Sequence, residues 1–165
     1  MLRKLCMSAG LLLIISVSVH AQDKVELFGG YSFERFGTSP GRNLNGWEVS
    51  GQYKIMSWLG AVADVDGHYA LPSSPDTRTV TFMVGPQISF PSRISPFAHV
   101  LVGLAHARST EFTDTSVASA VGGGIDLRLV PFVSWRVFQV DEVFTRVFGG
   151  TQNSARVSTG LMVRF

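Results

Sequence analysis

Hydrophobic and polar residues alternate with a period of two along most of the chain. In residues 25–34, Leu27 and Tyr31 lie on one face and Glu26 lies on the other, with Phe28 as an exception. Successive side chains of a β-strand point to opposite faces, so this alternation predicts a strand with one apolar and one polar face.

The same alternation recurs, separated by segments rich in Gly, Pro, Ser and Asn that predict turns and loops. In the fifth segment the run Val100-Leu101-Val102 does not alternate, so its faces stay unassigned. Each segment has about ten residues, the length that a tilted strand needs to cross a bilayer. The eight predicted strands are Val25–Glu34, Trp47–Ile55, Leu59–Tyr69, Val80–Phe90, Pro96–Arg108, Val117–Leu129, Phe132–Arg146 and Ala155–Phe165.

The connections between these strands alternate between long and short. An even number of strands, short periplasmic turns and longer extracellular loops are typical of outer-membrane barrels. Closure into a barrel satisfies every backbone hydrogen bond, which hydrocarbon requires. The pattern therefore predicts an all-β fold, an eight-stranded antiparallel up-and-down transmembrane β-barrel. Aromatic residues near the strand ends would form its interfacial girdles: Tyr31, Phe33, Trp47, Trp58, Phe90, Phe97, Trp135 and Phe144.

The first residues do not fit this pattern. Arg3 and Lys4 precede the apolar run 11–19, and Val19-His20-Ala21 resembles a cleavage site with small residues. A run about half as long as the ~20 apolar residues of a spanning helix favours a secretory signal over an anchor. We expect residues 1–21 to be a signal peptide and residues 22–165 to form the barrel domain.

Removal of the signal changes the chemistry of the chain. The single cysteine, Cys6, would leave with it, so the mature chain would have no disulfide, thiolate metal site or cysteine nucleophile. Of the 14 Lys and Arg residues, Arg3 and Lys4 would also leave, and twelve would then face twelve Asp and Glu residues. This balance does not favour a nucleic-acid partner.

Charged residues of both signs fall on the polar faces, which should point into the lumen. A barrel of eight strands is just wide enough for side chains to fill it, and buried charges need partners. We expect a mostly closed lumen plugged by paired charges, with a narrow gated pore as the alternative. The expected network comprises Glu26, Glu48, Lys54, Asp64, Asp66, Asp126, Arg128, Asp141, Arg156 and Arg164.

The sequence predicts neither catalytic residues nor a metal or cofactor site. The glycines 122–124 lack the Lys-Ser/Thr and the helix start of a phosphate loop. His68, His99 and His106 are far apart, and none has a serine two residues later. A lipid-modifying outer-membrane enzyme that uses a His-x-Ser pair is therefore a disfavoured alternative.

The C-terminus ends in Phe165, with Val163 and Leu161 at alternate positions before it. This end resembles the signal read by the outer-membrane barrel-assembly machinery. The whole mature chain resembles the OmpA-like outer-membrane β-barrel domain family, without a following peptidoglycan-binding domain, so we expect a stand-alone barrel. The resemblance implies the assembly machinery, outer-membrane lipid and lipopolysaccharide as partners.

The biological role is the least determined property. Long loops are natural binding regions, so a structural role and a surface-interaction role with an extracellular ligand both stay open. A soluble lipid-carrying barrel would share the alternation, but the signal, Phe165 and the charged face favour the membrane version. The polar residues expected in the long loops are Arg42, Asn43, Asp76, Arg78, Glu111 and Asp114.

The signal peptide gives the first testable expectation. N-terminal sequencing of protein purified from cells should begin at Gln22, because Val19 and Ala21 occupy the positions read by signal peptidase. The protein should sediment with outer membranes and require detergent for release. Recovery in the soluble periplasmic fraction without detergent would contradict this expectation.

Overall fold

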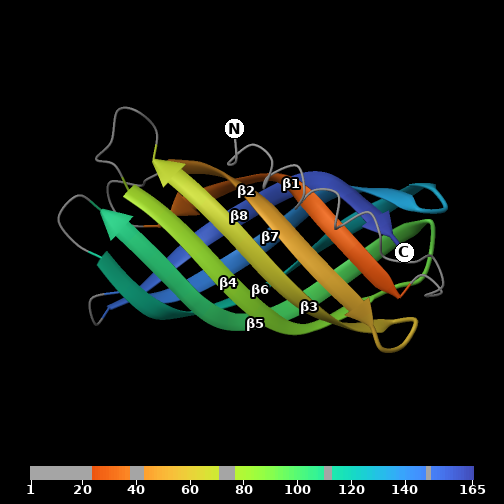
Figure 1. Cartoon of the computed structure of the whole chain (residues 1–165), viewed down its shortest axis with the longest axis horizontal. Helices are drawn as coiled ribbons and strands as arrows, with labels where there is room; N and C mark the ends of the chain where they lie inside the picture. Colours follow the sequence, from red (N-terminus) through yellow and green to blue (C-terminus); the bar gives the residue numbers. More distant parts are fainter. Residues whose placement is uncertain (1–23, 38–42, 71–76, 110–112, 148–149) are drawn as a thin grey trace, which may run out of the picture.

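A computed structural model of the chain describes residues 24–37, 43–70, 77–109, 113–147 and 150–165. These residues form a closed antiparallel barrel in which each strand pairs with the next and β1 pairs with β8 (Figure 1). The predicted signal, residues 1–21, lies outside the described residues, and no helix among the described residues is long and apolar enough to cross a membrane. The strands are β1 (Val25–Phe36), β2 (Asn43–Lys54), β3 (Leu59–Ala70), β4 (Thr77–Ser89), β5 (Ile94–Ser109), β6 (Thr113–Val130), β7 (Val133–Val147) and β8 (Gly150–Arg164).

The predicted fold class is confirmed, and several strands are longer than the alternation indicated. The short β2–β3, β4–β5 and β6–β7 connections gather at one end of the barrel, together with the C-terminus (Figure 1). We call this the turn end and the opposite one the loop end. Arg78 and Asp114, expected in loops, belong to β4 and β6. Asn43 begins β2, whereas Arg42, Asp76 and Glu111 lie outside the described residues.

The outer surface of the barrel is apolar. On β4, Phe82 and Val84 are exposed, while their neighbours Thr81 and Met83 are buried. An exposed apolar belt of this kind is stable only in contact with lipid. Exposed aromatic residues lie close to both ends, as the girdle prediction required: Tyr31, Trp47, Trp58, Phe90 and Trp135.

The faces of β5, which the sequence left open, are settled by burial. Phe97, His99 and Leu101 are buried, and Val100 and Val102 are exposed. The apolar run therefore has one apolar side chain inside and two outside, which a simple apolar-polar rule cannot resolve. The expected girdle position of Phe97 is wrong, because its ring points inward.

Arg136 does not fit the apolar-polar alternation of β7, and a β-bulge in this strand explains why. On the β8 side, Arg136 pairs with Gly160 and Gln139 with Ser158, so β7 contains one extra residue there. An extra residue reverses the inside and outside positions of a strand. Arg136 and Gln139 are consequently both buried in the interior, although they are three residues apart.

The β1–β8 pair closes the sheet. Its register runs from Glu26↔Arg164 to Phe36↔Ser154. At the end of this ladder, the Phe165 amide donates a hydrogen bond of 2.8 Å to the Val25 carbonyl, and the Val25 amide donates one of 3.2 Å to the Phe165 carbonyl. The terminal residue therefore completes the ladder that removes both edges of the sheet.

Deletion of Phe165 tests its expected second role as part of the assembly signal with Leu161 and Val163. We expect membrane insertion in cells to fall sharply. Refolding into detergent should lose only about 1–3 kcal/mol, the value of one partly buried aromatic side chain. Phe132→Ala is the control, because Phe132 is an exposed aromatic residue at the same end but not terminal. Equal insertion of the deletion variant and the wild type would contradict the assembly role.

Candidate functional site

The interior of the barrel holds charged side chains from most strands. Among the residues predicted to form the lumen network, Lys54 is partly exposed, with 19% of its side chain accessible. The buried members are Glu26, Glu48, Asp64, Asp66, Asp126, Asp141, Arg156 and Arg164. Period-two alternation predicted their inward direction, whereas their partners come from the closure of the barrel.

Arg156 on β8 is the centre of this set and is 1% exposed. Its Nη2 lies 2.7 Å from Oδ2 of Asp141 and 3.0 Å from Oδ2 of Asp64. Its Nη1 lies 2.8 Å from Oδ2 of Asp66. Glu48 approaches the same guanidinium at 3.9 Å. One cation therefore lies near four carboxylates, and its hydrogen bonds go to Asp141 and Asp66.

The contacts of Arg156 cross the lumen. Asp141 lies on β7, which is adjacent to β8, and the two residues are paired in register. Asp64 and Asp66 lie on β3, which pairs with β2 and β4 and not with β8. The guanidinium thus links two opposite walls through the barrel axis.

A second group lies beside the first and is built around Arg136. This guanidinium binds both carboxylate oxygens of Asp126, at 2.8 and 3.1 Å, and donates to Gln139 Oε1 over 2.7 Å. The rings of Phe28 and Phe97 lie 4.5 and 4.2 Å from it, as cation–π contacts. The inward Phe28, an exception to the alternation, therefore covers a buried cation.

Gln139 connects the two groups. Its Nε2 donates to Glu48 over 2.9 Å and to Asp141 over 2.7 Å, while its Oε1 accepts from Arg136. His99 adds a contact between Nε2 and Asp141 Oδ1 of 2.8 Å. The two arginine groups are consequently parts of one polar network.

Arg128 is a correction to the predicted network. Its side chain is exposed near the turn end, and its amide donates to the Arg93 carbonyl in the β4–β5 turn over 2.9 Å. The β6–β7 ladder is shifted between Arg128 and Val130, so the alternation no longer assigns faces there. Asp126, another member of the expected network, binds Arg136.

Smaller polar groups lie nearer the two ends. Towards the turn end, Glu26 is paired with Lys54 at 2.7 Å and with Arg164 at 2.6 Å. Towards the loop end, His68 Nδ1 lies 2.9 Å from Asp66 and 3.3 Å from Glu34. Polar contacts therefore extend along the length of the barrel.

The interior is not polar throughout. One side is filled by a buried apolar cluster from β3 to β7, and inward glycines make room for the larger side chains. A Cβ added at Gly122 would overlap the Asp141 carboxylate, which explains the small residue there. The cluster consists of Val62, Met83, Leu101, Ala105, Ala118, Ala120 and Val143.

Sequence reasoning missed Arg136, Glu34 and Gln139. Glu34 was on the polar face of its segment, and its accepted bond from Ser154 needed the β1–β8 register. Arg136 was hidden by the bulge, whose signal in the sequence was the misfit itself. No group of three or more His, Cys, Asp or Glu residues within the described ranges is arranged to hold a metal ion.

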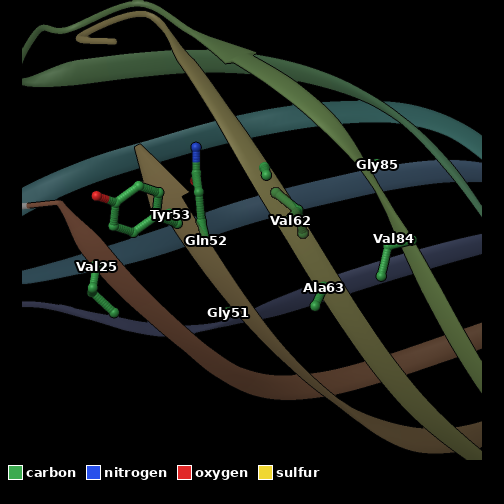
Figure 2. A pocket seen from close by; sticks show the side chains of 9 residues that line it. Val25, Gly51, Gln52, Tyr53, Val62, Ala63, Val84 and Gly85 are labelled. Atoms are coloured by element: carbon green, nitrogen blue, oxygen red, sulfur yellow. The ribbon is translucent and has the colours of Figure 1, made fainter. Parts of the chain in front are cut away.

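A pocket on the outer wall is the other candidate site (Figure 2). Its lining includes the exposed Tyr53, Ala61, Ala63 and Val84, so it opens towards lipid. Small side chains on neighbouring strands form this shallow apolar surface, which lacks the convergent polar groups of a specific ligand site. The interior network is therefore the stronger candidate.

The fold is similar to those of small outer-membrane barrels of known structure. The crystal structure of neisserial surface protein A shares 15% identity at a TM-score of 0.68, covering 86% of this chain and 97% of that one. The attachment invasion locus protein Ail of Yersinia pestis shares 14% identity at a TM-score of 0.60, covering 87% and 99%. OprG of Pseudomonas aeruginosa shares 9% identity at a TM-score of 0.55, covering 87% and 96%.

Ail has also been solved with the heparin analogue sucrose octasulfate, at 13% identity, a TM-score of 0.61, and coverage of 86% and 98%. No protein-family model and no curated protein matches the chain. The closed barrel and its exposed apolar belt place the chain in the outer membrane.

Substitution of Arg156 tests the central network. Arg156→Gln should lower the free energy of unfolding by about 3–5 kcal/mol, because it leaves buried carboxylates without their cation. The measurement is urea unfolding of the barrel refolded in lipid vesicles. Arg128→Gln is the matched control and should change the free energy by less than about 0.5 kcal/mol, since its side chain is exposed. Similar effects of the two substitutions would show that the interior is hydrated and open.

Proposed function

We propose that this protein is a structural barrel of the outer membrane with a mostly closed, charge-filled lumen and a surface-interaction role. The observation that carries the proposal is the position of Arg156, which contacts carboxylates of β3 and β7 across the barrel axis. A solute passing through the lumen would have to displace this guanidinium. The proposed function therefore depends on the outer surfaces of the barrel and not on transport.

The energetics favour a plug that persists. Each charge-assisted hydrogen bond at Arg156 contributes about 1.5–3 kcal/mol. Breaking these bonds would leave buried charges without partners. The apolar cluster around Met83 and Leu101 fills the other side of the lumen. Both halves of the interior thus resist the entry of water.

The proposed contacts of the barrel lie on its outside. Its apolar belt would contact outer-membrane lipid and lipopolysaccharide, and its C-terminal strand would bind the barrel-assembly machinery during insertion. The loop end would meet an extracellular ligand. The similar fold of Ail, solved with a sulfated heparin analogue, makes an anionic surface ligand a reasonable first class to test.

A narrow gated pore is the second candidate, and one observation favours it. Among the described residues, buried carboxylates outnumber the buried guanidinium groups, which are those of Arg136, Arg156 and Arg164. A rearrangement of the shared carboxylates around Arg156 would expose an acidic path that selects cations.

Planar-bilayer recording distinguishes the two candidates. The purified wild-type barrel should show no steady conductance at the level of a general porin, because its lumen is filled. Arg156→Ser, which shortens the plug, should raise the conductance, while Arg128→Ser should leave it unchanged. Steady porin-level conductance of the wild type would contradict the closed lumen, and brief cation-selective openings would support the gated pore.

A further inference from the structure

Two arginines lie side by side on the outer wall at the loop end. Arg78 is the second residue of β4, and Arg108 is the penultimate residue of β5. They are direct partners in the antiparallel register, and both side chains are exposed. Directly opposed residues have Cβ atoms about 5 Å apart, so the two guanidinium groups can reach one small anion.

No carboxylate among the described residues forms an ion pair with either arginine. Like charges opposite each other destabilise a sheet. The pair therefore lowers the stability of the barrel unless an anion binds between the two guanidinium groups. Arg78 is partly held in place, because its guanidinium lies 5.5 Å from the centre of the Tyr69 ring on β3. On the next outward position of β5, exposed His106 contacts Thr115 at 2.8 Å.

The apolar belt begins close to this pair. The next outward residues of β4 are Val80 and Phe82, and Leu104 follows His106 on the outward face of β5; Val80, Phe82 and Leu104 are all exposed. The arginines therefore lie where the hydrocarbon layer ends and lipid headgroups begin. Water can solvate two exposed cations at this depth. A phosphorylated lipid headgroup would attract them more strongly than an uncharged headgroup, because its charge is opposite.

We propose that Arg78 and Arg108 bind a phosphate group of a phosphorylated lipid headgroup in the leaflet at the loop end. This inference rests on the proposed placement of that end at the cell surface, and it assigns residues to the proposed lipid contact. Guanidinium groups hold phosphate oxygens through paired N–H donors. The bound phosphate offsets the repulsion within the pair, so lipid binding and barrel stability are coupled.

The first experiment measures lipid binding. Folded wild-type protein in non-ionic detergent is titrated with bisphosphorylated lipid A, and bound lipid is counted by native mass spectrometry. The double variant R78Q/R108Q should bind on the order of tenfold more weakly, as expected for the loss of charge-assisted contacts. The control R93Q/R128Q removes two exposed arginines at the turn end, which are linked through their backbones, and should bind like the wild type.

Further arms identify the source of the anion. Dephosphorylated lipid A should bind to the wild type as weakly as bisphosphorylated lipid A binds to R78Q/R108Q, and inorganic phosphate should compete only weakly. Equal loss of binding in both double variants would overturn the proposal in favour of non-specific attraction. Tight binding of inorganic phosphate or of sucrose octasulfate without binding of lipid A would assign the pair to a soluble anion.

A second measurement uses the repulsion itself. In non-ionic detergent without lipid A, Arg78→Gln should raise the thermal unfolding midpoint, because it removes the repulsion. With saturating lipid A the same substitution should lower the midpoint relative to the wild type, because it removes a phosphate contact. A change in the unfolding midpoint that has the same direction with and without lipid A would overturn the proposal. The closed-lumen function fails separately, through conductance, which neither arginine should affect.

Discussion

Hydrocarbon offers no partner for a free backbone amide or carbonyl, and the rest of this structure depends on that constraint. The β1–β8 pair, extended to the Val25 and Phe165 backbones, satisfies both edges of the sheet at once. Once eight strands close, the lumen is narrow, so inward side chains from opposite walls must meet. The ion pairs of Arg156 with β3 are a consequence of this closure and not of any local motif.

The narrow lumen makes the polar network and the glycines interdependent. Asp141 occupies the space over Gly122, and from there it reaches Arg156, His99 and Gln139. A larger residue at position 122 would displace the carboxylate that holds the central guanidinium. Similarly, the bulge in β7 brings Arg136 into the interior. There its guanidinium binds Asp126 and makes cation–π contacts with two aromatic rings. Backbone irregularity and charge pairing therefore support each other.

The inner and outer surfaces of the barrel have different proposed roles, which are closure of the lumen for the inner surface and contact with lipid and ligands for the outer surface. The interior holds charges in mutual contact around Arg156 and Arg136, which supports the proposed closed lumen. The exterior carries apolar side chains, with the exposed Arg78 and Arg108 pair at its loop-end border. Because no carboxylate of the described residues forms an ion pair with these arginines, an external anion would stabilise them. This contrast directs the search for function to the outer wall and the loop end.

The alternation of side chains alone determined the fold class, the number of strands and the facing of most buried charges, because the period of a strand is a local property. Glu48, Asp66 and Asp141 were placed inside on that basis. Local pattern failed where a ladder shifts, as at Arg136 and Arg128, and where apolar residues occupy both faces, as in β5. Only the tertiary structure decided which charges pair, because Arg156 and Asp66 are 90 residues apart and meet through closure. The same holds for Arg78 and Arg108, whose proximity is a consequence of strand register.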